Sequence, residues 1–393
     1  MIYSLNIAIH NKLNLLKIAL FLSIIISSCT GNKKKLYDGK LSSGGLIILK
    51  AERFTIEKKD GYTILTIINP WQGAKNVYQQ YYLLRSGYKL PALPDSSGVI
   101  RVPVKNIICM STTHVAMISA LGEESTISGM SGTGFIFEKS LAVRIEKGLI
   151  KDVGYEGNLN KELILKIAPD LIMMYGIGSE SSGYIGKVRE LGVKVVFNAD
   201  YLETDPLGKA EWIKLFGALY CKESLADSIY KSEVETYNKL KSYISQHISS
   251  RPKVLLGLPY KDTWYVSPGN SFMSKIIRDA GGDYLWKNTE SSISMPYGIE
   301  NVYLEALNAD YWLNIGSANT KDEISMVDQR LKDLPCFKKG NLFNNNNRMT
   351  LSGGNDYWES GSVYPHVILK DIAAILHPEL FPDTEFFFYH KIY

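Results

Sequence analysis

Hydrophobic and polar positions alternate along this chain with two different periods. The segment FTIEKKDGYTILTI (54–67) follows the two-residue period of β-strands and breaks at Lys59–Gly61, which predicts a hairpin, and VYQQYYLL (77–84) predicts a further strand. Further along, short apolar runs such as NIICM (106–110) and DLIMMY (170–175) are separated by stretches with helical spacing. Strands that alternate with helices of this length predict parallel sheets in α/β units.

One segment departs from this alternation. Residues 222–249 contain no glycine and no proline, and their apolar residues recur at helical spacing. About 28 residues at 1.5 Å each predict a helix of roughly 40 Å, which ends at Arg251-Pro252. The α/β alternation then restarts and closes with a helix at about 362–376. The pattern therefore predicts an α/β protein with two Rossmann-like lobes joined by one long rigid helix.

These patterns also predict how the chain is divided. The N-terminal lobe is expected at 45–220, the inter-lobe helix at 221–250 and the C-terminal lobe at 251–393. Within the first lobe, residues 45–100 are β-rich and 101–220 are α/β. A faint internal repeat supports two lobes of like topology, because residues 158–176 align with 298–316 and match Asp170 to Asp310. Chance similarity between two α/β units is the alternative.

The N-terminus predicts export. Residues 1–28 carry two lysines, no acid and an apolar run of signal-peptide length, so they are interpreted as a signal peptide. The sequence Ile26-Ser-Ser-Cys29 resembles a bacterial lipobox, in which the chain is cleaved before Cys29 and the thiol is acylated. An ordinary secretory signal with a chance cysteine is the alternative. Residues 29–44 are then a lipidated, flexible tether.

Composition narrows the function. Without residues 1–28 the net charge falls from +4 to +2, and no basic stripe is present, so nucleic acid is not an expected partner. The chain without residues 1–28 is longer than one hydrophobic core usually fills, which favours two domains or lobes. Cys109, Cys221 and Cys336 fit neither a zinc pattern nor a disulfide framework.

Four ordered segments resemble one family, the periplasmic substrate-binding lipoproteins of iron-complex and cobalamin ABC importers. They are MSTTHVAMISALGEESTISGMSG (110–132), VGYEGNLNKELILKIAPDLIMMYG (153–176), SPGNSFMSKIIRDAGGDYLW (267–286) and GGNDYWESG (353–361). The resemblance covers about residues 100–393 and implies a class III periplasmic binding protein fold. The β-rich region 45–100 departs from the compact members and is expected to be an N-terminal elaboration. The resemblance also implies a periplasmic, lipid-anchored monomer that hands its ligand to a membrane permease.

The expected ligand is a ferric chelate of the siderophore or haem type, with cobalamin as the alternative. Ligands of open α/β sheets bind outside the carboxyl ends of the strands, and aromatic faces supply contact area for a large rigid ligand. The expected ligand-binding residues lie in such turns, several of them beside glycines, and they are Thr113, His114, Tyr155, Tyr175, Tyr297, Arg348, Tyr357 and Trp358. For the aromatic residues, packing beneath the turn is the alternative. For His114 it is helix capping or packing.

Two further expectations concern chemistry and docking. The stretch Gly129–Thr133 fails the nucleophile-elbow pattern at its last position, and the histidines form no ligand-spaced pairs with acids, so neither an enzyme nor a built-in metal cage or cofactor is expected. A secreted hydrolase or an adhesion lipoprotein is the alternative from another class. In the family, one surface glutamate on each lobe pairs with permease arginines, and the matching residues are Glu162 and Glu300. The alternative role for both is to favour a helix start through the helix dipole.

Overall fold

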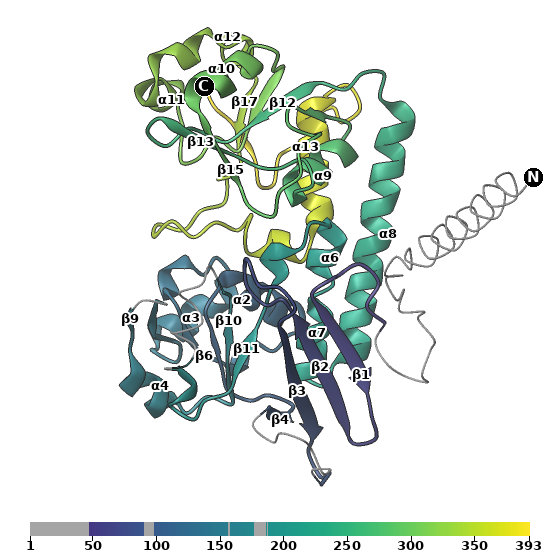
Figure 1. The fold of residues 1–393 in the computed structure, drawn as a ribbon, viewed down its shortest axis with the longest axis vertical. Coiled ribbons are helices and arrows are strands. Elements are labelled where there is room, and N and C mark those ends of the chain that lie inside the picture. Colours follow the sequence, from purple (N-terminus) through teal and green to yellow (C-terminus); the bar gives the residue numbers. More distant parts are fainter. Residues whose placement is uncertain (1–46, 90–97, 156–157, 177–185, 187) are drawn as a thin grey trace, which may run out of the picture. The chain divides into compact units, whose positions relative to one another are not determined.

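The computed structural model describes residues 47–89, 98–155, 158–176, 186 and 188–393. The expected signal peptide, Cys29 and the tether therefore lie outside the described residues. The described body contains two hydrophobic cores, and one α/β lobe is built around each of them (Figure 1). No helix among the described residues is both long and apolar enough to cross a membrane.

The first lobe has a five-stranded parallel sheet in the order β11-β10-β5-β6-β7. Its strands are β5 (Ile107–Cys109), β6 (Ile127–Met130), β7 (Lys151–Asp152), β10 (Leu171–Met174) and β11 (Val195–Phe197), and a short hairpin comprises β8 (Gly154–Tyr155) and β9 (Asn158–Leu159). Its helices are α2 (Thr112–Ala120), α3 (Ala142–Glu146), α4 (Lys161–Ile167), α6 (Pro206–Ala210) and α7 (Ile213–Leu219). The prediction of parallel α/β units is confirmed for this lobe.

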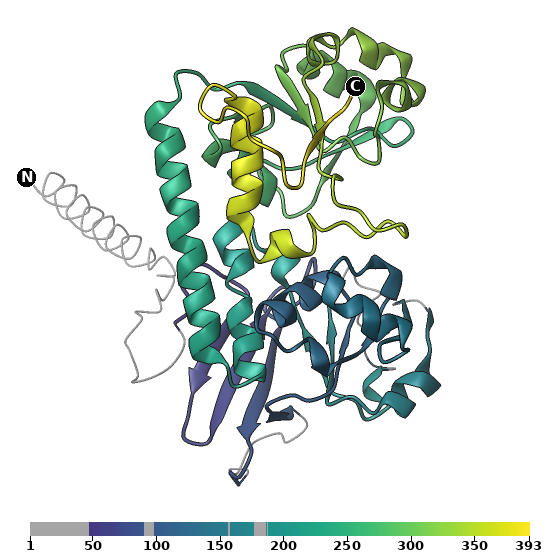
Figure 2. The ribbon, with the colours of Figure 1, turned by 180° about the vertical axis from the view of Figure 1, so that it is seen from behind.

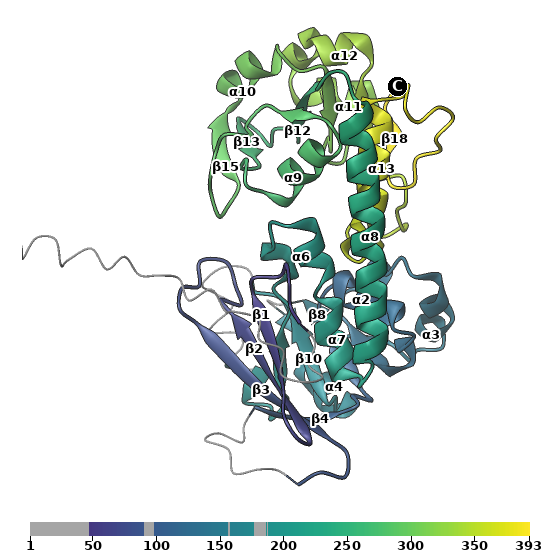
Figure 3. The same cartoon turned by 90° about the vertical axis from the view of Figure 1, so that its right-hand side faces the viewer.

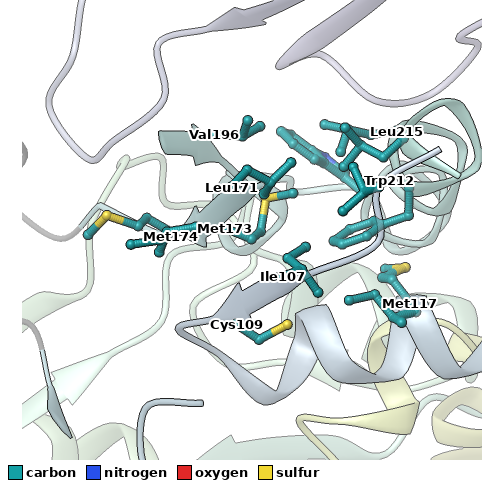
Figure 4. Close-up of a cluster of buried hydrophobic side chains, with 14 of the residues drawn as sticks. Ile107, Cys109, Met117, Leu171, Met173, Met174, Val196, Trp212 and Leu215 are labelled. Atoms are coloured by element: carbon teal, nitrogen blue, oxygen red, sulfur yellow. The ribbon is translucent and has the colours of Figure 1, made fainter. Parts of the chain in front are cut away.

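The core of the first lobe fills the space between this sheet and its helices. Figure 4 shows Ile107 and Cys109 of β5 near Met117 of α2, together with Leu171 and Met173 of the neighbouring strand β10. All five side chains are fully buried, as is Trp212, which precedes α7. Continuous apolar runs such as LIMM are expected for parallel strands covered on both faces. Cys109 is a free buried thiol, and Cys221 and Cys336 are also free.

A second, four-stranded sheet precedes the α/β part of this lobe. Its strands are β1 (Phe54–Lys58), β2 (Tyr62–Ile68), β3 (Tyr78–Arg85) and β4 (Val99–Val102), in that order across the sheet. The predicted hairpin is confirmed, because β1 pairs antiparallel with β2 and the turn uses a positive φ at Gly61. This sheet shares the first core, since the Phe54 ring lies 4.6 Å from that of Trp212. It is the N-terminal elaboration that the sequence predicted (Figure 3).

The long helix α8 (Glu223–His247) joins the two lobes. Ala226 and Tyr230 near its start are buried in the first core, whereas Tyr237 and Ile244 near its end are buried in the second. Helix α13 (Pro365–Leu376) lies beside it (Figure 2). The carboxylate of Glu233 on α8 accepts the backbone N–H of His366 on α13 at 2.9 Å.

The second lobe repeats the architecture of the first. Its sheet has the order β14-β12-β16-β17-β18, parallel except for the last pair. Its strands are β12 (Lys253–Leu256), β14 (Asp283–Tyr284), β16 (Tyr311–Leu313), β17 (Leu342–Asn344) and β18 (His390–Lys391). A separate two-stranded antiparallel sheet comprises β13 (Thr263–Val266) and β15 (Met295–Gly298). Its further helices are α9 (Phe272–Asp279), α10 (Ile299–Ala306), α11 (Lys321–Val327) and α12 (Pro335–Lys339).

The internal repeat has a structural counterpart. In both lobes a helix runs into a central strand through an aspartate, α4 into β10 through Asp170 and α10 into β16 through Asp310. The Asp170 carboxylate accepts the backbone N–H of Lys105 at 2.8 Å, and the Asp310 carboxylate accepts that of Lys253 at 2.9 Å. Each aspartate therefore fixes the start of the neighbouring strand, β5 or β12.

Two short helices follow Asp205. They are α6 and α7, with a break between them at Glu211–Trp212. The Glu211 carboxylate accepts the backbone N–H groups of Leu49, Lys50 and Ala51 at 2.6–3.0 Å. These distant contacts, which no local pattern reveals, hold the incoming N-terminal segment against the break.

Candidate functional site

A cavity of about 900 Å³ lies between the two lobes. The first lobe contributes residues that follow β5, β6 and β10, and the second contributes residues that follow β16 and β17, so the carboxyl ends of both parallel sheets meet there. Its described lining residues are Met110, Ser111, Thr112, Met130, Ser131, Phe135, Tyr155, Tyr175, Gly316, Ser317, Asn319, Asn346, Met349, Gly353, Gly354, Asn355 and Trp358. This is where ligands bind in open α/β sheets.

Aromatic side chains face this cavity from both lobes. Tyr155 on β8 is 65% exposed and Phe135 is 47% exposed, while Trp358 on the opposite side is 51% exposed. Tyr175 follows β10, and its ring lies 6.4 Å from that of Tyr201. Exposed aromatic faces around one cavity supply a large contact area for a ligand at low conformational cost.

The described lining of this cavity carries no charge. It consists of aromatic rings, thioethers, hydroxyls, amides and glycines, with no Asp, Glu, Lys, Arg or His among them. Within the described residues, no three His, Cys, Asp or Glu side chains are placed to hold a metal ion. The cavity therefore offers stacking surfaces and neutral hydrogen-bonding groups.

The stretch LSGGNDYWESG (351–361) brings the second lobe up to the first. A Cβ on Gly354 would lie 2.1 Å from the backbone oxygen of Phe135, so only glycine allows this close approach. The hydroxyl of Thr350 donates to the carbonyl of Gly134 at 2.8 Å. These contacts close one side of the cavity with backbone from both lobes.

A buried carboxylate makes a second inter-lobe contact in the same stretch. The side chain of Glu359, which is 2% exposed, accepts the backbone N–H groups of Phe137 at 2.9 Å and Glu138 at 2.8 Å. Burial raises the pKa of Glu359 to about 7, although the two hydrogen bonds act in the opposite direction. The Glu359 carboxyl, which lies at a contact between the lobes, therefore titrates near neutral pH.

The structure brings three of the expected ligand-binding residues to this cavity: Tyr155, Tyr175 and Trp358. Thr113 does not line the cavity, although its neighbours Ser111 and Thr112 do. Ser111 is the N-cap of α2, and Thr112 is the first residue of that helix. Tyr297 lies on β15, opposite Trp264 of β13 in their two-stranded sheet, and does not line the cavity.

Two other expected ligand-binding residues are buried. The His114 side chain is fully buried near Phe216, and burial lowers its pKa to about 3. The Tyr357 ring is 1% exposed and packs on Phe388. Neither side chain has surface to offer a ligand in this structure.

Arg348 does not line this cavity. Its Nε donates to the Asp356 carboxylate at 2.6 Å, and its guanidinium lies between the rings of Phe137 and Phe387, 4.7 and 4.1 Å from their centroids. It lines a separate cavity of about 450 Å³ behind the stretch 351–361. Its charge is therefore already paired within the protein.

Several lining residues were not predicted, among them Phe135, Asn319, Asn346 and Met349. Asn346 lies shortly after the end of β17. The rule that ligands bind at the carboxyl ends of strands, which pointed to Tyr175, therefore applies to Asn346 as well. Phe135 ends a short 3-10 helix and Met349 lies outside the named strands, and no local pattern distinguishes them. Their place depends on the approach of the two lobes.

The two expected docking glutamates are at helix starts on different lobes. Glu162 lies in the first turn of α4 and is exposed. Glu300 lies in the first turn of α10 and forms an exposed ion pair with Arg330 at 3.3 Å.

Comparisons with known proteins agree with this geometry. The periplasmic binding protein family matches residues 107–352. An uncharacterized lipoprotein of Methanocaldococcus jannaschii is 31% identical over 348 residues, which are 83% of this chain and 81% of the relative. The fold is similar to that of a periplasmic heme binding protein from Pseudomonas aeruginosa (TM-score 0.56, 15% identity, 74% of this chain and 98% of that one). It is also similar to the periplasmic vitamin B12 binding protein of Vibrio cholerae (TM-score 0.50, 14% identity, 71% and 98%). The chain therefore belongs to the periplasmic binding protein family, the solute-binding proteins of ABC transporters.

Proposed function

We propose that this protein captures a metal chelate in the cavity between its lobes and delivers it to the permease of an ABC importer. The observation that carries the proposal is the uncharged, aromatic lining of that cavity, shared between Tyr155 and Tyr175 on one lobe and Trp358 on the other. The expected chelate is a ferric complex of the siderophore or haem type. Such a ligand brings its own donor atoms and needs from the protein stacking surfaces and a few hydrogen bonds.

Cobalamin is the second candidate, and one observation favours it. Arg348, the cation expected to meet an anionic chelate, is paired with Asp356 and lies outside the cavity lining. A corrin ring whose edge carries neutral amides suits an uncharged lining better than a chelate with several carboxylates or catecholates, because unpaired charge is costly to bury.

A secreted hydrolase, the candidate from another class, has less support. A nucleophilic serine needs a base within hydrogen-bond reach. The hydroxyl of Ser111, which lines the cavity, lies 3.1 Å from that of Thr113 and accepts the backbone N–H of Thr113. The nearest histidine in sequence, His114, is buried.

The remaining parts of the proposal concern anchoring and partners. A relative is named a lipoprotein, which supports acylation at Cys29 and a periplasmic, membrane-attached location. Glu162 and Glu300 are proposed to contact the permease, one from each lobe, and the protein is proposed to act as a monomer.

Titration of the purified protein tests the ligand. Intrinsic tryptophan fluorescence should be quenched on binding, because Trp358 lines the cavity. The panel comprises several ferric siderophores, haem and cobalamin, each with calorimetry as a second readout. Binding of any one of them at micromolar or lower concentration supports the proposal, and failure of all of them contradicts it.

A further inference from the structure

A second cavity of about 600 Å³ adjoins the first, and Trp358 lines both. One of its walls comes from the loop that connects β2 and β3, from Trp71 to Lys75, together with residues 201–204. The other wall comes from the second lobe, from residues around the start of α9 and from Ser291–Ser294. The cleft is therefore longer than the 900 Å³ cavity alone.

The N-terminal sheet positions the wall that contains Trp71. Figures 1 and 3 place the β2–β3 loop at the end of that sheet nearest the second lobe. Trp71 forms a backbone bridge with Gly176, and its ring meets that of Phe197 edge-on at 5.6 Å. The backbone N–H of Gln72 donates to the hydroxyl of Tyr201 at 3.2 Å. These bonds fix the loop to the residues that follow β10 and β11, so the loop is a built part of the cleft.

The two cavities differ in charge. The first has no charged side chain in its described lining, whereas the second includes Arg53 and Lys75. The guanidinium of Arg53 donates to the carbonyl of Asn69 at 3.1 Å, and within the described residues neither cation has a carboxylate within ion-pair distance. The one acid in this lining, Glu203, accepts the backbone N–H groups of Glu52 and Arg53 and the indole N–H of Trp212, and it interacts electrostatically with Arg53. Lys75 is therefore the cation without a nearby acid in the described lining.

Serine hydroxyls complete the second cavity. Ser271, Ser291, Ser292 and Ser294 line it beside Asn270. Hydroxyls, an amide and two cations together suit an anionic group, which accepts hydrogen bonds from all of them. The first cavity offers aromatic surface without charge, and the second adds two cations to its own aromatic residues.

We propose that the cleft recognises a ligand in two parts: an uncharged ring portion that stacks in the first cavity, and an anionic arm that enters the second cavity beside Trp71, Arg53 and Lys75. This inference rests on the proposed function and narrows its ligand class to a metal complex of a rigid macrocycle that carries a phosphate- or carboxylate-bearing arm. The N-terminal sheet is then a specificity element, because it supplies the cationic wall.

Matched pairs of probes test the arm. Cyanocobalamin carries a nucleotide arm with a phosphodiester, and dicyanocobinamide has the same ring without that nucleotide. Haem carries two propionates, and haem dimethyl ester has them blocked. The proposal expects the armed member of one pair to bind at least tenfold more tightly than its armless partner, and the pair that responds identifies the arm as phosphate or carboxylate.

Variants locate the effect in the second cavity. Arg53→Gln combined with Lys75→Gln should lower the affinity for the armed probe about tenfold and leave that for the armless probe unchanged. Lys75→Gln alone, in an exposed loop position, should give part of this loss without a change in melting temperature. Lys58→Gln with Arg101→Gln removes the same charges from exposed strand positions outside both linings and serves as the control.

The outcomes separate the inference from the proposed function. Equal affinities for armed and armless probes, unaffected by the Arg53 and Lys75 variants, would overturn the two-part ligand while the chelate-binding function stands. Binding of none of the four probes would also overturn it, and the siderophore titrations would then decide the proposed function separately.

Discussion

Tyr357 and Trp358 are neighbours in sequence, and their rings meet edge-on at 4.6 Å, but they face opposite environments. The Tyr357 ring is 1% exposed in the second core, and burial raises the pKa of its hydroxyl. The Trp358 indole is 51% exposed and lines both cavities of the cleft. One residue therefore packs the stretch 351–361 against the core, and the next presents a ring to the two cavities.

This pair gives the first prediction. Trp358→Ala should weaken ligand binding by about 1–3 kcal/mol, as for a buried aromatic contact, with little change in melting temperature. Tyr357→Ala should instead destabilise the fold by about 3–5 kcal/mol because it leaves a core cavity. Calorimetric titration and thermal melts of both variants separate the roles. A large loss of stability with unchanged affinity in Trp358→Ala would show that the indole is a packing residue.

The second prediction concerns pH and Glu359. Since burial raises the pKa of this carboxyl from 4.5 to about 7, the folded state retains a proton between these pH values that the unfolded state has lost. Stability should therefore fall as pH rises from about 4.5 to 7, by up to about 3 kcal/mol. Glu203, whose pKa burial also raises to about 7, acts with the same sign.

Denaturant unfolding at several pH values provides the measurement. Glu359→Gln should reduce the fall in stability between pH 4.5 and 7, whereas the exposed Glu146→Gln should leave it as in the wild type. Identical pH profiles for the wild type and Glu359→Gln would mean that Glu359 titrates as an ordinary glutamate.

The third prediction concerns His114. Burial lowers the pKa of this imidazole to about 3, and among the described residues neither ring nitrogen has a hydrogen-bond partner. The neutral ring must therefore gain a proton on unfolding below pH 6.5, so its contribution to stability is lost as pH falls from 6.5 towards 3. His114→Leu, of similar volume, should stabilise the protein at pH 7 by about 1–2 kcal/mol and reduce the acid-side loss. A destabilised variant would indicate that the ring has a partner, such as a buried water.

The fourth prediction tests docking. Glu162→Ala with Glu300→Ala should leave ligand affinity intact and abolish uptake in a reconstituted importer, and each single change should reduce uptake in part. Glu146→Ala with Glu305→Ala changes two exposed glutamates elsewhere on the same two lobes and should transport normally. If the Glu162 and Glu300 variant transports at the wild-type rate, the two acids only favour helix starts.

The fifth prediction concerns the anchor. Cys29→Ser should give a protein that no longer partitions into detergent and carries no lipid label, because serine offers no thiol to acylate. Metabolic labelling with a fatty acid and phase separation provide the measurement. A serine variant that remains lipid-labelled would exclude acylation at Cys29.

Much of the fold follows from local pattern. The β1–β2 hairpin has the predicted turn at Gly61, and the glycine-free segment 222–249 contains a single helix, Glu223–His247. These features depend on periodicity and on turn residues, which a sequence displays directly. Asp170 and Asp310, which match in the faint internal repeat, also make equivalent side-chain hydrogen bonds in the two lobes.

The site was less predictable, because it depends on which way a side chain points and on contacts between distant segments. Tyr357 and Trp358 look alike in sequence, yet the turn at Asn355 directs only one of them outward, and Asn355 itself is held by the carbonyl of Asn345. The sequence alone gives no partner for the Arg348 cation, whereas in the structure Asp356 and two aromatic rings contact it. The part of the cleft formed by Trp71 comes from a segment about 100 residues before Tyr175 in sequence.

Helix α8 has a consequence for how the protein unfolds. Ala226 and Tyr230 of its first half are buried in one core and Tyr237 and Ile244 of its second half in the other, and the helix contains no glycine or proline. Loss of either core would expose apolar residues of a helix that the other core still needs, so the two lobes are expected to melt in one cooperative transition. A ligand bound between the lobes would then raise the melting temperature of the whole body, which makes a thermal shift a sufficient screen for the transported solute.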